Sequence, residues 1–113
     1  MMESQVELNN QRLELRNKFA EILPEFMGAE SEVVDIAYRD GALNARMKRL
    51  IALGIALRAG CTNCILSQTK SALDEGATKA EILETLQVVV AMSGTPGVGE
   101  SLRVLKFLEE LGI

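Results

Sequence analysis

Two cysteines, Cys61 and Cys64, are the residues of this chain whose type and spacing suit covalent chemistry. Two thiols three residues apart can form a reversible disulfide, hold a metal ion, or fill space in a core. The 113 residues include no histidine, so the usual proton carrier and the commonest metal ligand are both missing. Because zinc takes about four nitrogen or sulfur ligands, we expect no metal site and favour thiol redox chemistry.

The elements around the cysteines predict that the pair lies at a helix start. An apolar helix is expected over residues 44–59, Gly60 suits the left-handed position that ends a helix, and a new helix is expected over residues 61–75. Backbone N–H groups at a helix N-terminus favour a thiolate, and cysteines at positions i and i+3 share one face of the first turn. Arg49 and Arg58 would add positive potential if they point at the pair. These features predict an activated nucleophile beside a resolving thiol.

The rest of the chain indicates a single all-α domain, residues 1–113, built as a bundle of five or six helices. Further helices are expected over residues 6–23, 31–38, 78–92 and 98–111, with an irregular piece at 25–29 and a glycine-proline turn at 93–99. Helical apolar spacing predicts that residues 50–57 are buried on all sides and that two further stripes face inward. The stripe residues are Leu8, Leu15, Phe19, Ile22, Leu23, Leu102, Leu105 and Leu108. Three methionines are expected as core gap-fillers, namely Met27, Met47 and Met92.

Composition narrows the class of protein. The net charge is −4 and the pI is near 4.9, which argues against a nucleic-acid partner. The first residues lack the basic and apolar regions of a signal peptide, and the apolar run at residues 50–57 is too short to span a bilayer. We therefore expect a soluble, cytoplasmic protein with no membrane partner. In a reducing compartment a lone cysteine pair indicates redox or metal chemistry rather than a structural staple.

Three segments carry a resemblance to a known family. They are MKRLIALGIALRAGCTNC at residues 47–64, EGATKAEI at 75–82 and GTPG at 94–97. From residue 44 to about residue 111, their order and spacing resemble the carboxymuconolactone decarboxylase / AhpD-like superfamily. The resemblance implies an all-helical domain that forms homo-oligomers, often trimers or hexamers.

The resemblance also implies roles for individual residues. In AhpD-type alkylhydroperoxidases a CxxC pair cycles between dithiol and disulfide, and a Glu and a His relay protons to it. Here Arg49 stands twelve residues before Cys61, where the Glu is expected, and Gln68 stands four residues after Cys64, where the His is expected. Neither side chain accepts a proton near neutral pH. The family pattern makes Cys64 the attacking thiol and Cys61 the resolving one, with the reverse, thioredoxin-like order as the alternative.

These observations predict a thiol-disulfide oxidoreductase with peroxiredoxin-like, antioxidant peroxidase activity. Its substrate would be a hydroperoxide or a protein disulfide, its reductant a thiol or dithiol, and its cofactor none beyond the redox-active disulfide. Gln68, Arg49 and Arg58 are the candidate supporting residues, with Glu84 and Glu100 as candidate acids. Two alternatives stay open. One is an oligomeric scaffold or small-molecule binder that has lost the relay, and the other is a non-redox, decarboxylase-like lyase.

Overall fold

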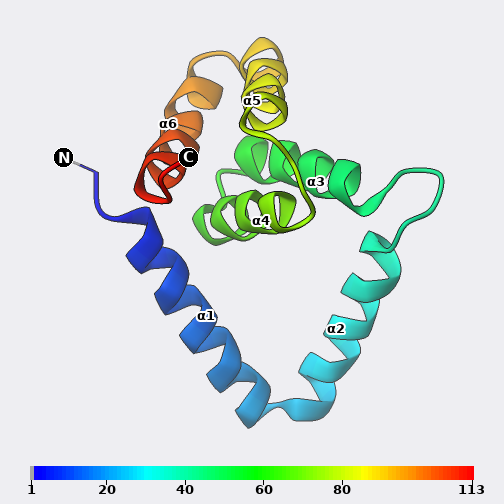
Figure 1. Cartoon of the computed structure of the whole chain (residues 1–113). Coiled ribbons are helices and arrows are strands. Elements are labelled where there is room, and N and C mark those ends of the chain that lie inside the picture. Colours follow the sequence, from blue (N-terminus) through cyan, green and yellow to red (C-terminus); the bar gives the residue numbers. More distant parts are fainter. Residues whose placement is uncertain (1) are drawn as a thin grey trace.

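The computed structural model describes residues 2–113, which form six helices and no strand. The helices are α1 (Gln5–Ile22), α2 (Pro24–Tyr38), α3 (Ala45–Ala59), α4 (Thr62–Asp74), α5 (Lys79–Ser93) and α6 (Thr95–Glu110). Helices α3 to α6 pack together, whereas α1 and α2 form an open, V-shaped arm beside them (Figure 1). The all-α prediction is confirmed. No helix in this part of the chain is long and apolar enough to cross a membrane.

The core lies among α3, α4, α5 and α6 and is almost entirely aliphatic. Leu53, Ile65, Ile82 and Val104 are completely buried there, and burying such a side chain contributes about 1.5–3 kcal/mol. A Cβ atom on Gly97 would lie 3.0 Å from the Val89 carbonyl oxygen, so only glycine allows α6 to approach α5 this closely. Gly97 lies in the first turn of α6, within the segment expected as a glycine-proline turn.

The first turn of α1 is fastened to the last turn of α6. Glu110 accepts hydrogen bonds from the Ser4 hydroxyl at 2.6 Å and from the Gln5 backbone N–H at 2.7 Å. The bond from Ser4, followed by the backbone bond, holds the pKa of Glu110 below its ordinary value. Arg103 donates to the amide oxygen of Gln5, which is completely buried. The arm is thus fixed at its origin and extends away from the bundle.

Two predictions from the sequence are wrong in the arm formed by α1 and α2. No irregular piece occupies residues 25–29, because α2 begins at Pro24 directly after α1. Proline cannot continue α1, but its missing N–H is no loss in the first turn of a new helix. The prediction that one apolar stripe of α1 faces inward is also wrong for four of its residues. They are 47–74% exposed, namely Leu15, Phe19, Ile22 and Leu23.

Further expected core positions are exposed because the rest of the described chain covers their helix faces only in part. Ile51 and Ile55 of α3 are 50% and 66% exposed, so that helix is not buried on all sides. Helix α6 begins at Thr95 rather than at residue 98, and it buries Leu108 but leaves two of the predicted stripe residues exposed, Leu102 and Leu105. Of the three methionines, Met27 is buried as predicted, whereas the other two, Met47 and Met92, are exposed.

Candidate active site

The cysteine pair occupies a sharp junction between α3 and α4. Gly60 ends α3 in the left-handed conformation, with φ of 69°, and its N–H donates to the Leu57 carbonyl. This conformation is disfavoured for residues with a side chain, which is why glycine stands here. Cys61 is then the N-cap of α4, and the helix itself begins at Thr62. The predicted helix start at the pair is confirmed to within one residue.

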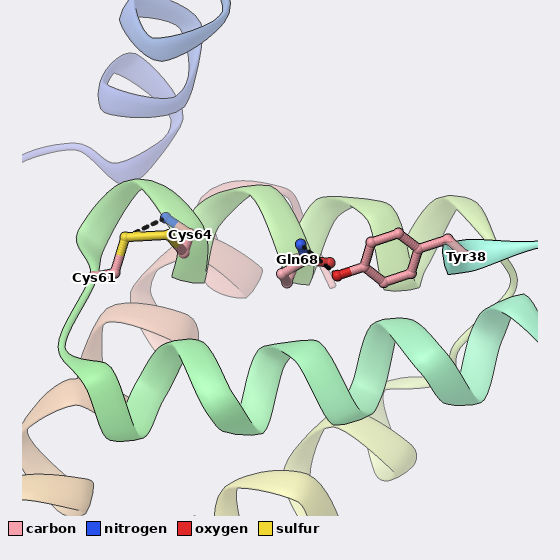
Figure 2. The surroundings of a disulfide bond; sticks show 4 residues. All are labelled: Tyr38, Cys61, Cys64 and Gln68. Atoms are coloured by element: carbon pink, nitrogen blue, oxygen red, sulfur yellow. Dashed lines mark hydrogen bonds between the residues drawn. A yellow bond between two sulfur atoms is a disulfide. The ribbon is translucent and has the colours of Figure 1, made fainter. Parts of the chain in front are cut away.

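Cys61 and Cys64 are joined by a disulfide across the first turn of α4, with their Cα atoms 5.2 Å apart (Figure 2). The Cys64 backbone N–H donates a hydrogen bond to the Cys61 sulfur at 3.2 Å. The sulfur takes the place of the oxygen that usually caps a helix. Cys64 is exposed and Cys61 is half-buried. Negative charge on either sulfur after reduction would face the positive end of the α4 dipole.

A second group of side chains, which we call the polar cluster, lies further along α4 and consists of Tyr38, Arg49 and Gln68. Arg49 Nη1 donates to Gln68 Oε1 at 3.2 Å, and Gln68 Nε2 donates to the Tyr38 hydroxyl oxygen at 3.3 Å. The Arg49 guanidinium lies over the Tyr38 ring, 3.6 Å from its centroid. Gln68 follows Cys64 by about one helical turn, and Figure 2 shows the cysteines, Gln68 and Tyr38 in one row.

The structure brings together two of the three candidate supporting residues. Arg49 and Gln68, at the positions where the family relay is expected, form a hydrogen bond with each other. Sequence reasoning missed Tyr38, which comes from the end of α2, before the segment that carries the resemblance. It is the only tyrosine of the chain, but no spacing in the sequence connects it with the cysteines.

The third candidate, Arg58, lies elsewhere. It is exposed and lines a groove between α3 and α5, and no hydrogen bond or ion pair within residues 2–113 joins it to the cysteines. Of the two candidate acids, Glu100 approaches the site. Its carboxylate oxygen Oε1 is 3.9 Å from the position that a Cβ on Gly60 would take. Glu84 is exposed on α5. A carboxylate from α6 therefore lies beside the Gly60 turn.

The fold and the junction define an all-helical protein with a cysteine pair at a helix start. Residues 24–107 match the carboxymuconolactone decarboxylase family. A protein of Cupriavidus necator is 35% identical over 88 residues, which are 78% of each chain. A second relative, from the cox locus of Paracoccus denitrificans, is 34% identical over 76 residues, 67% of this chain and 68% of that protein.

Two crystal structures share the fold. A carboxymuconolactone decarboxylase family protein from Legionella pneumophila superposes with a TM-score of 0.87 and 31% identity, over 94% of this chain and 95% of that one. A family protein from Thermotoga maritima, described as "possibly involved in antioxidative response", gives a TM-score of 0.75 and 28% identity, over 89% of each chain. The chain belongs to the carboxymuconolactone decarboxylase family, and the resemblance drawn from its sequence is confirmed.

Proposed function

We propose that this protein is a thiol-disulfide oxidoreductase that reduces hydroperoxides through Cys61 and Cys64. The observation that carries the proposal is the disulfide at the start of α4, in which Cys64 is exposed and the Cys61 sulfur accepts a backbone N–H. The relative from Thermotoga maritima with its suggested antioxidative role adds support. A structural staple would not need its sulfur at the surface, whereas a sulfur that exchanges with substrate and reductant would.

The exposed residue, Cys64, is assigned the attack on the peroxide. In the reduced protein its thiolate attacks the terminal oxygen of R–O–O–H, so that a sulfur–oxygen bond forms as the oxygen–oxygen bond breaks. The alkoxide leaves, takes a proton from water and becomes the alcohol, and Cys64 becomes a sulfenic acid. The Cys61 thiolate then attacks the Cys64 sulfur, which expels hydroxide and closes the disulfide.

Reduction of the disulfide begins at the same exposed residue, Cys64. A thiolate of an external dithiol attacks the Cys64 sulfur, and Cys61 leaves as a thiolate. The hydrogen bond from the Cys64 N–H and the α4 dipole stabilise the charge on this leaving group. The second thiol of the reductant then breaks the mixed disulfide and restores the dithiol. The cycle needs no bound cofactor.

The polar cluster supplies no base for this cycle, because Gln68 and Arg49 do not accept protons at neutral pH. Outside the cluster, Glu100 is the acid next to the Gly60 turn, and the position of the pair at the helix start favours the thiolate. General acid-base catalysis contributes about 10²–10⁴-fold where it operates, so we expect slower peroxide reduction than a site with a working relay would give.

A coupled assay tests the proposal. Cumene hydroperoxide consumption with excess dithiothreitol would be compared for the parent, Cys61→Ser and Cys64→Ser. We expect multiple turnovers in the parent and none in either variant. Equal rates in all three proteins would refute the redox role and favour the scaffold or small-molecule binder. Decarboxylation of a carboxylated lactone that survives the double Cys→Ser change would favour the lyase.

The exposed apolar side chains support a second proposal, that the protein works as a homo-oligomer. Leu15, Ile22, Phe26 and Val33 of the arm are 63–74% exposed, and apolar surface of this kind on several neighbouring positions marks an interaction site. A second copy of the chain would cover it, in a trimer or hexamer. Sedimentation analysis should show such a species, and Ile22→Ser with Phe26→Ser should shift it toward the monomer. A monomeric parent protein would contradict the assembly.

A further inference from the structure

We propose that the polar cluster binds the carboxylate of an anionic substrate, so that carboxylated hydroperoxides are the preferred substrate class. The inference rests on the proposed peroxidase function and names the substrate of the same site. Its starting point is the charge of Arg49. Within residues 2–113, three other arginines lie within 4.0 Å of a carboxylate, in the pairs Arg16–Glu30, Arg46–Glu81 and Arg103–Glu3. Arg49 has no such partner, although it is half-buried. The half-buried Arg12 also lacks one, but it donates to Asn9 of its own helix, whereas Arg49 donates to Gln68 of the cysteine-bearing helix α4.

The surroundings of Arg49 leave part of its hydrogen-bonding capacity unused. Its Nη1 donates to Gln68, but its Nε is buried and has no hydrogen-bond partner. One face of the guanidinium is covered by the Tyr38 ring. A partly buried guanidinium without a counter-ion is costly. The buried Nε is closed to a ligand, but Nη2 is not buried and has no hydrogen-bond partner within residues 2–113, so a carboxylate can accept N–H bonds from the Nη1–Nη2 end. An anion is therefore the ligand that this arrangement fits.

The hydrogen-bond directions within the cluster add a second donor. Gln68 uses its amide oxygen for Arg49 and one N–H for the Tyr38 hydroxyl oxygen. Because the Tyr38 oxygen already accepts a bond, its own O–H is available to donate. A carboxylate beside Arg49 could thus receive bonds from a guanidinium and a phenol, whereas an ester or amide would lack the charge.

The cluster lies at a distance from the sulfur that one small molecule can span. Gln68 follows Cys64 by four residues, which is about 6 Å along the helix axis. A compact organic hydroperoxide with its carboxylate at the cluster would place its oxygen–oxygen bond toward Cys64 (Figure 2). Arg49 and Gln68 then serve recognition at the positions where the sequence resemblance implies a proton relay.

Binding can be measured without turnover. The chain has one tyrosine and no tryptophan, so its intrinsic fluorescence reports on Tyr38 alone. Oxidised protein would be titrated with hexanoate and with the neutral hexanamide. We expect a saturable change with hexanoate only, its loss in Arg49→Gln, and its retention in Arg58→Gln, which removes the same charge outside the cluster. Arg49→Lys should retain a weaker response. An equal response to hexanamide, or no saturable response to hexanoate, would overturn the inference.

Turnover gives the second readout. A cumene hydroperoxide that carries a carboxylate on its ring would be compared with the methyl ester of the same compound. We expect the parent to favour the acid by about tenfold or more in kcat/KM, as a charge-assisted hydrogen bond predicts, chiefly through KM. Arg49→Gln should remove the preference, and Arg58→Gln should keep it. Equal rates for acid and ester in the parent would refute the substrate class and leave the peroxidase function standing. If neither is reduced, the peroxidase function fails, and the hexanoate titration still decides whether the cluster binds carboxylates.

A carboxylate of a second copy is the competing occupant of the cluster. It would abolish the hexanoate response and make the oligomer depend on Arg49, so that Arg49→Gln but not Arg58→Gln would shift the sedimentation profile toward the monomer. That pair of results would contradict the substrate assignment.

Discussion

The two ends of one face of α4 differ in what they can do. At the start of the helix, Cys61 and Cys64 can make and break covalent bonds, and Cys64 is exposed. One turn further, Arg49, Gln68 and Tyr38 offer hydrogen-bond donors and a positive charge but no base. The difference implies that reaction and recognition are separated along the helix. Changes at the first end should then affect chemistry, and changes at the second should affect substrate preference.

The largest expected effect is the difference in single-turnover peroxide reduction between the two cysteine variants. Reduced Cys61→Ser should consume about one equivalent of cumene hydroperoxide and leave a Cys64 sulfenic acid that dimedone traps. Cys64→Ser should react at least about 100-fold more slowly, because its remaining thiol belongs to the half-buried residue Cys61. Stopped-flow kinetics with mass spectrometry measures both. The opposite pattern would show the thioredoxin-like order, with Cys61 as the attacking thiol.

An intermediate effect is expected from rebuilding the relay. The double change Arg49→Glu with Gln68→His places an acid and an imidazole at the positions that the family resemblance implies. We predict a rise of about 10–100-fold in kcat for cumene hydroperoxide, because a proton carrier returns to the pair. The gain should appear as pH rises through about 6.5, where the imidazole becomes neutral.

The matched control for this gain is Arg58→Glu with Gln68→His. It keeps the imidazole at position 68 but makes the Arg→Glu change outside the polar cluster. It should give a smaller gain because its acid does not reach the imidazole. An unchanged kcat in the rebuilt variant would mean that proton transfer does not limit the reaction, and the assignment of slow turnover to the missing relay would be wrong.

The smallest expected effect comes from Tyr38→Phe. The ring remains under the Arg49 guanidinium, but Gln68 loses its acceptor and a bound carboxylate loses a donor. One hydrogen bond contributes about 1 kcal/mol, so KM for the carboxylated hydroperoxide should rise about fivefold, while kcat for the methyl ester stays within about twofold. A drop in kcat for both substrates would instead place Tyr38 in the chemical step.

Local sequence signals predicted the junction, and they failed where burial depends on distant contacts. Gly60 and the cysteines indicated a helix start because a left-handed cap and an N-cap involve neighbouring residues only. Tyr38 was missed because it reaches Gln68 from another helix. Apolar spacing predicted that Ile55 is buried, yet it is 66% exposed. Such a pattern marks an apolar face without saying whether the same chain or another one covers it.

The central claim, that the start of α4 activates a thiol, is tested most directly by titration of the reduced protein. Thiolate absorbance near 240 nm would be followed against pH in the parent and in each Cys→Ser variant. We predict that the pKa of at least one thiol lies clearly below the free-cysteine value of about 8.5, because the helix N-terminus and the Cys64 N–H stabilise the thiolate. If both thiols titrate at or above about 8.5, the pair is not activated and the claim is wrong.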